Sequence, residues 1–173
     1  MDEPLGIVEE NLTETGDTIQ MVGFRLAGEL FGVDILMVQE ILKQIPITKI
    51  PDSPDFIAGI INLRGRIIPI IDLRKRLYLK ETGPAIEEEG WTLILNAGGR
   101  VTGFIVDHVT HVIKLPAGTI QPPTEKVASA LKSDYLSGVC MLEEQPMAIL
   151  DFNRIVVVDE FKRLGAQKRL QSK

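Results

Sequence analysis

Two short apolar runs, Ile57–Leu63 and Ile67–Leu73, flank the polar triplet Arg64–Arg66 and form the clearest pattern in the chain. Both runs are rich in β-branched isoleucine and are bounded by turn-forming residues, which predicts two buried strands joined by a tight turn. Gly65 supplies the positive φ that such a turn requires. Pro69 has no backbone N–H, so we expect its strand to lie at a sheet edge or to carry a bulge.

Further apolar segments predict strands over residues 20–26, 31–35, 91–96, 101–106, 135–142 and 146–152. The segment Leu36–Leu42 fits a helical face and a bent strand about equally, and both interpretations stay open. Residues 155–170 have apolar side chains at helical spacing and cations at their end, which predicts a C-terminal amphipathic helix. Polar residues 1–18 are expected to form a mobile N-terminal tail, and acidic residues 79–90 a linker.

The two halves of the chain resemble each other. Three pairs of segments align without gaps, namely Phe31–Ile35 with Thr102–Val106, Phe56–Leu63 with Tyr135–Leu142, and Ile70–Leu73 with Ile149–Phe152. Each half supplies about five short strands, enough to close a small barrel. We expect barrels over about residues 19–78 and 91–154, while an exchange of a strand between the halves stays open. The turn at Arg64-Gly65 is basic and its counterpart Glu143-Glu144 is acidic, which predicts different tasks for the halves.

Length and charge narrow the class of protein. A chain of 173 residues fits one domain or two small fused ones. The single cysteine, Cys140, excludes an internal disulfide and fits a reducing compartment. A net charge of −5 disfavours nucleic-acid binding, which requires a basic face. No apolar run approaches the roughly 20 residues of a membrane span, so we expect a cytoplasmic protein without direct membrane insertion.

No catalytic constellation is evident. The only histidines, His108 and His111, are three apart and would point to opposite faces of a strand, which argues against a metal site. Three aspartates follow apolar strands, namely Asp34, Asp72 and Asp151. We interpret them as acceptors of backbone hydrogen bonds in turns. Two alternatives stay open: a pair of nucleic-acid-binding barrels, and a small hydrolase or metal enzyme that uses Cys140 or the histidines.

The remaining candidate chemistry lies on the surface. Arg64 stands on a rigid turn backed by an apolar sheet, and a guanidinium in such a place is typical of protein interfaces. A solvated turn residue is the alternative. Glu40 lies between Gln39 and Ile41 and has the same two interpretations, an exposed carboxylate or a contact residue.

Several segments together resemble the CheW family, the coupling proteins of bacterial chemotaxis. They are Leu30–Ile35, Val38–Ile41, Ile47–Pro51, Phe56–Gly65 and Ile68–Arg74, and the similarity covers about residues 19–164. The Asn-Leu-Arg-Gly turn followed by Pro-Ile-Ile-Asp-Leu-Arg is the most specific part. The resemblance implies an all-β fold of two tandem five-stranded SH3-like β-barrel subdomains with a C-terminal α-helix. It implies no catalytic residues, no metal and no cofactor.

The resemblance also implies partners. Members link the cytoplasmic tip of methyl-accepting chemoreceptors to the regulatory domain of the histidine kinase CheA, within membrane-associated arrays. The free protein is expected to be a monomer. By motif position, the implied receptor-binding residues are Val38, Glu40, Arg64 and Val112, and the implied kinase-binding residues are Gly59 and Ile67.

Overall fold

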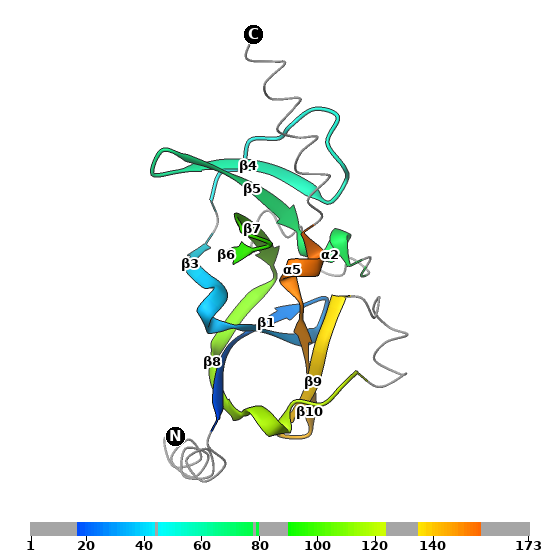
Figure 1. The fold of residues 1–173 in the computed structure, drawn as a ribbon. Helices are drawn as coiled ribbons and strands as arrows, with labels where there is room; N and C mark the ends of the chain where they lie inside the picture. The colour runs from blue at the N-terminus through cyan, green and yellow to red at the C-terminus, as the bar shows by residue number, and fades with distance from the viewer. Residues whose placement is uncertain (1–16, 44, 78, 80–89, 124–134, 157–173) are drawn as a thin grey trace.

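The computed structural model of the chain describes residues 17–43, 45–77, 79, 90–123 and 135–156 (Figure 1). Three sequence-based expectations lie almost wholly outside these residues. They are the N-terminal tail at 1–18, the acidic linker at 79–90 and the C-terminal helix at 155–170.

Ten β-strands in two five-stranded sheets make up most of the described chain, so the all-β prediction is confirmed. The terminal sheet has the order β8-β1-β2-β10-β9 and consists of β1 (Thr18–Leu26), β2 (Glu29–Asp34), β8 (His108–Pro116), β9 (Leu136–Leu142) and β10 (Gln145–Leu150). The central sheet has the order β3-β6-β7-β5-β4 and consists of β3 (Val38–Lys43), β4 (Ile57–Leu63), β5 (Arg66–Asp72), β6 (Trp91–Ala97) and β7 (Arg100–Val106). The short helical elements are η1 (Ile35–Met37), α2 (Leu73–Arg76), η2 (Ala117–Thr119) and α5 (Phe152–Ile155).

Each sheet combines strands from both halves of the sequence. The hairpin β1–β2 pairs with β8 and β10, while the hairpin β6–β7 pairs with β3 and β5. This arrangement differs from our expectation of one barrel over 19–78 and another over 91–154. The sequence left open the exchange of a strand between the halves, and the structure exchanges a whole hairpin in each direction. The physical reason is that the two hairpins carry the same apolar pattern, so local sequence does not decide which sheet receives which hairpin.

The duplication itself is visible in the strand register. Ile149 of β10 lies opposite Gly32 of β2 in a parallel pair, and Ile70 of β5 lies opposite Gly103 of β7 in the same way. A Cβ atom at Gly103 would lie 2.4 Å from Cδ1 of Ile70, and one at Gly32 would lie 2.9 Å from Sδ of Met147. The aligned glycines therefore permit the same close approach of strands in both sheets.

Backbone bridges bring the two edges of each sheet together. Thr48, which follows β3, exchanges hydrogen bonds of 2.9 and 2.8 Å with Ile60 of β4. Gln121, which follows β8, makes the equivalent pair of 2.9 and 2.8 Å with Val139 of β9. Each sheet thus curls toward closure in an SH3-like manner, although its strand ladder is not a continuous barrel.

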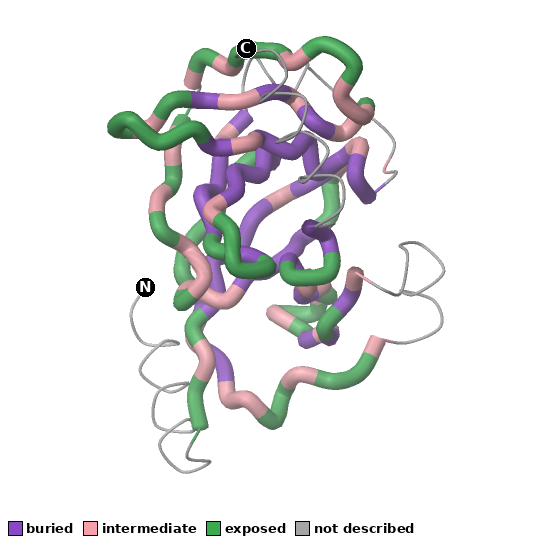
Figure 2. Tube along the Cα trace, turned by 45° about the horizontal axis from the view of Figure 1, so that its top comes forward, coloured by how far each residue is buried: buried purple, intermediate pink, exposed green. Residues whose placement is uncertain are grey.

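The largest apolar cluster is shared by both sheets. Phe152 of α5 stacks on Phe104 of the central sheet with ring centroids 4.8 Å apart, and it also contacts Phe24 of the terminal sheet at 6.3 Å. Phe24 in turn stacks on Phe31 at 5.8 Å. All four rings are essentially inaccessible to solvent, and Figure 2 shows buried residues concentrated inside the molecule and exposed ones at its turns. Both sheets therefore contribute side chains to this one core, called the shared core below.

Because Phe152 joins the two sheets, Phe152→Ala should destabilise both together, by about 3–5 kcal/mol in the free energy of unfolding. Urea unfolding and amide hydrogen exchange measure the effect. Arg154→Ala on the same helix is the control, since its side chain is 65% exposed and surface substitutions usually change stability by about 0.5 kcal/mol or less. Loss of exchange protection in one sheet alone would contradict a shared core.

Candidate functional site

The first part of the site is set by a turn before β3. The carboxylate of Asp34 accepts a 2.9 Å hydrogen bond from the backbone N–H of Leu36 and begins the single turn η1. The chain then continues as strand β3, so of the two interpretations of Leu36–Leu42 the bent strand is the one observed. A register shift between Val38 and Glu40 opposite β6 marks a bulge, which bends the strand.

The second part is the turn between β4 and β5. The side chain of Asn62 accepts a 2.9 Å hydrogen bond from the backbone N–H of Gly65. Both central residues have positive φ, 52° at Arg64 and 84° at Gly65, as a type I′ turn requires. The sequence predicts positive φ at Gly65 alone, so the left-handed conformation of Arg64 is an addition from the structure. A left-handed conformation costs a non-glycine residue about 1 kcal/mol, so the fold holds Arg64 in this position against a local preference.

The two parts meet in a bidentate ion pair. Nη1 of Arg64 donates to Oε2 of Glu40 at 2.7 Å, and Nη2 donates to Oε1 at 2.8 Å. The side chain of Arg64 is 72% exposed, whereas that of Glu40 is only 26% exposed. The carboxylate therefore fixes one edge of the guanidinium, while the rest of that planar group faces solvent. Both residues are candidates from the sequence, but their contact is visible only in the structure.

The ion pair affects the ionisation of both groups. The hydrogen bonds from Arg64, together with its positive charge, hold the pKa of the Glu40 carboxyl below its ordinary value. The same contacts raise the pKa of Arg64. Because the folded pKa of Glu40 lies below its unfolded value, the contribution of this group to stability is present above the unfolded pKa and is lost as pH falls through the folded pKa.

The two valines have different positions. Val38 is half-buried and packs against the shared core from β3, the strand that also holds Glu40. Val112 lies in the other sheet on β8, opposite Val22, whose side chain belongs to the same core. Paired residues of antiparallel strands share a face, so Val112 is on the side of the terminal sheet that faces the shared core. Its side chain is 44% exposed.

The implied kinase-binding residues also differ in character. Ile67 of β5 is 47% exposed and available for contact. Gly59 of β4 is buried, and a Cβ atom there would lie 2.2 Å from the backbone oxygen of Thr48. A side chain at Gly59 would therefore disturb the bridge between Thr48 and Ile60. The absence of a side chain at Gly59 therefore leaves room for this bridge. Ile67, by contrast, belongs to the exposed surface of the hairpin.

The equivalent site in the terminal sheet has the opposite charge pattern. Its turn holds Glu143 at φ 46° and Glu144 at φ 68°, so two glutamates occupy the positions of Arg64 and Gly65. By the strand alignment, His111 occupies the position of Glu40. Among the described residues the structure records no ion pair at this second turn. The two turns thus have the same backbone conformation but carry side chains of different charge.

The aspartates that follow strands have structural roles. Besides Asp34, Asp72 accepts a hydrogen bond from the backbone N–H of Lys75 at 3.3 Å, and Asp151 accepts one from the backbone N–H of Asn153 at 3.1 Å, as the sequence predicts.

Burial raises the pKa of the Cys140 thiol, which makes it a weaker nucleophile. Within the described ranges, no group of three or more metal-ligating side chains occurs. The same residues include no helix long and apolar enough to cross a membrane.

The effect of Arg64 on Glu40 can be measured directly. We expect Arg64→Met to raise the midpoint of the Glu40 carboxyl titration, followed by carbon-detected NMR, because the variant removes both hydrogen bonds. Arg154→Met is the matched control, since its ion pair involves Asp151 and not Glu40. An unchanged Glu40 midpoint in Arg64→Met would show that the pair does not form in solution.

Comparison with known proteins adds a family to this geometry. Residues 20–160 match the family model described as the CheW-like domain. The chain is 39% identical over 147 residues to "Chemotaxis protein CheW" of Klebsiella aerogenes, covering 84% of this chain and 87% of that protein. It is 34% identical over 151 residues to the protein of the same name from Treponema pallidum, covering 86% and 88%.

A solved structure agrees with the sequence matches. The scaffolding protein TtCheW from Thermoanaerobacter tengcongensis superposes with a TM-score of 0.73 at 36% identity, covering 80% of this chain and 92% of that one. Its description as a scaffolding protein agrees with the expectation that this chain is not an enzyme. The predicted resemblance is confirmed, and the chain belongs to the CheW-like domain family.

Proposed function

We propose that this chemotaxis scaffold is a non-enzymatic adaptor that couples methyl-accepting chemoreceptors to the histidine kinase CheA. The observation that carries the proposal is the bidentate pair between Glu40 and Arg64. The Glu40 carboxylate holds the Arg64 guanidinium in place, and the turn that carries Arg64 has a left-handed conformation. The side chain therefore loses little further conformational freedom when it binds a partner.

The proposed receptor surface combines this pair with apolar side chains. The half-buried Val38 lies two residues before Glu40 on β3, and Val112 offers an exposed valine on the terminal sheet. A receptor helix would bury an apolar stripe against such valines, while Arg64 sets its register by polar contacts. These residue types fit the helical cytoplasmic tip of a chemoreceptor.

The proposed kinase surface lies on the hairpin β4–β5 and includes the exposed side chain of Ile67. Gly59 supports it indirectly, because the bridge between Thr48 and Ile60 holds the outer edge of the hairpin. Under this proposal the protein is a monomer in the cytoplasm when free and joins membrane-associated receptor arrays through its two partners. A net charge of −5 gives no support to the alternative of nucleic-acid binding.

Arg64→Ala should weaken receptor binding by about 2 kcal/mol or more, roughly 30-fold, with the fold intact. The loss arises because the variant removes the oriented guanidinium and leaves the Glu40 carboxylate without its partner. Isothermal titration with a receptor cytoplasmic fragment measures the effect, and Arg154→Ala is the matched control. Binding of both receptor and kinase at wild-type strength by Arg64→Ala would refute the role of this residue.

A second variant tests whether the two surfaces are distinct. Ile67→Glu places a charge in the exposed apolar contact, so it should weaken binding to CheA at least tenfold while leaving receptor binding nearly unchanged. The decisive measurement is a three-component reconstitution in which kinase activity responds to receptor only when this chain is added. If a folded Ile67→Glu protein lost affinity for CheA and for receptor equally, the two partners would bind one common surface.

A further inference from the structure

A hollow opens in the central sheet where β5 separates from β7. The parallel pairing of these strands covers only Ile70–Asp72 with Gly103–Ile105. Pro69, immediately before it, has no N–H to continue the ladder, so the strands diverge there. The expectation of a sheet edge or a bulge at Pro69 is therefore wrong: β5 is an interior strand, and Pro69 is accommodated because its part of β5 has no partner in β7. The β5–β7 hollow, about 510 Å³ in volume, occupies the gap.

The terminal sheet provides an internal comparison, because its parallel strands stay paired at the same place. Ala148, the counterpart of Pro69, has an N–H and pairs in parallel with Phe31. Gln145, the counterpart of Arg66, accepts a 3.1 Å hydrogen bond from Nη2 of Arg25. The hollow is therefore not a general property of this backbone. It follows from the particular residues at the central-sheet positions.

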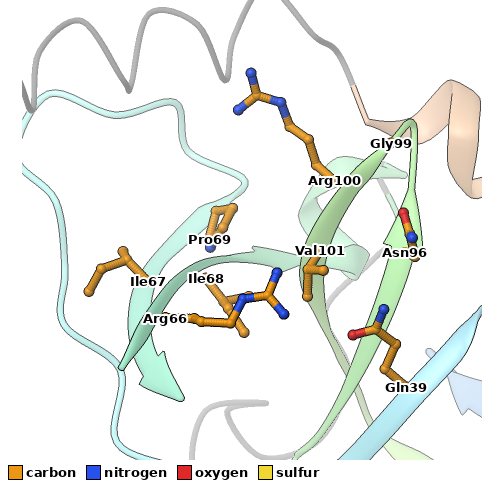
Figure 3. A pocket seen from close by; sticks show the side chains of 9 residues that line it. All are labelled: Gln39, Arg66, Ile67, Ile68, Pro69, Asn96, Gly99, Arg100 and Val101. Carbon is orange, nitrogen blue, oxygen red and sulfur yellow. The ribbon is translucent and has the colours of Figure 1, made fainter. Parts of the chain in front are cut away.

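The lining of the β5–β7 hollow is cationic and polar at its rim. Figure 3 shows the side chain of Arg66 extending from β5 toward Val101 of β7, with the amide of Gln39 facing the same space from β3. Arg100 lies at the end of β7. Arg66 and Arg100 are both exposed, and within the described part of the chain neither has an ion pair. By contrast, Arg64, which lies two residues before Arg66, forms the ion pair with Glu40.

We propose that the β5–β7 hollow receives a glutamate or aspartate side chain of the partner that contacts Ile67, with Arg66 as its main ligand. This inference rests on the proposed function, in which that partner is the regulatory domain of CheA. A guanidinium presents a fork of donors that matches a carboxylate in two parallel hydrogen bonds. Pro69 and Val101 give the same hollow an apolar margin. Ile67 adjoins Arg66 in β5 but its side chain points to the other side of the strand (Figure 3), so a partner that covers this end of the hairpin would contact Ile67 and place its carboxylate against Arg66.

The test uses the full chain and the purified CheA regulatory domain as the probe. Arg66→Gln introduces the residue found at the equivalent terminal-sheet position, and Arg154→Gln is the matched control. We expect Arg66→Gln to bind the regulatory domain about tenfold more weakly. Its affinity should also depend less on salt than that of the wild type, because a charge pair has been lost. Receptor binding should not change.

The other outcomes separate this inference from the proposed function. One outcome is that Arg66→Gln binds the regulatory domain with wild-type affinity and salt dependence while Ile67→Glu binds it more weakly. This outcome would overturn the proposed contact between a partner carboxylate and Arg66, but not the adaptor role. A loss of receptor binding instead of kinase binding would overturn the assigned partner. Failure of the wild-type chain to bind the regulatory domain at all would overturn both proposals.

Discussion

The contact of Phe152 with Phe104 and Phe24 is the interaction on which the rest of the structure depends. It places one ring between the two sheets, on α5, which directly follows β10 after the chain has passed from the terminal sheet to the central sheet and back. Aromatic rings at such distances bury large apolar areas and resist sliding. The two sheets are therefore held in one relative position, which the proposed adaptor role requires if the protein is to present separate surfaces to two partners.

A buried cation supports the same junction. Arg76 is 6% exposed, and its guanidinium lies 4.5 Å from the ring centre of Phe56 and 5.3 Å from that of Tyr135. Its Nε also donates a 3.0 Å hydrogen bond to the backbone oxygen of Ile155. Phe56 and Tyr135 are counterparts in the two halves, so a single residue links the corresponding points of both repeats. Cation–π contacts stabilise more strongly where water is excluded.

The two repeats differ at several positions that the proposed function uses. The backbone is nearly the same in both sheets, and the glycines that allow the parallel strands to approach are shared. The side chains at equivalent positions are not. An ion pair in one sheet corresponds to His111 and Glu143 in the other, and Pro69 corresponds to Ala148. The backbone is thus duplicated, while different side chains at a few equivalent positions give the two sheets different surfaces.

The sequence by itself determined most of the strands and the family, although β8 (His108–Pro116) was not among the strands that it predicted. Alternating and β-branched runs marked the strands, the Arg64-Gly65 turn marked a hairpin, and Asp72 marked the end of β5, because these signals act over a few residues. Only the tertiary structure decided which hairpin joins which sheet, that Arg64 binds Glu40, and that a hollow opens beside Pro69. Those features depend on pairings between distant segments with nearly identical patterns, and packing of the shared core selects among them.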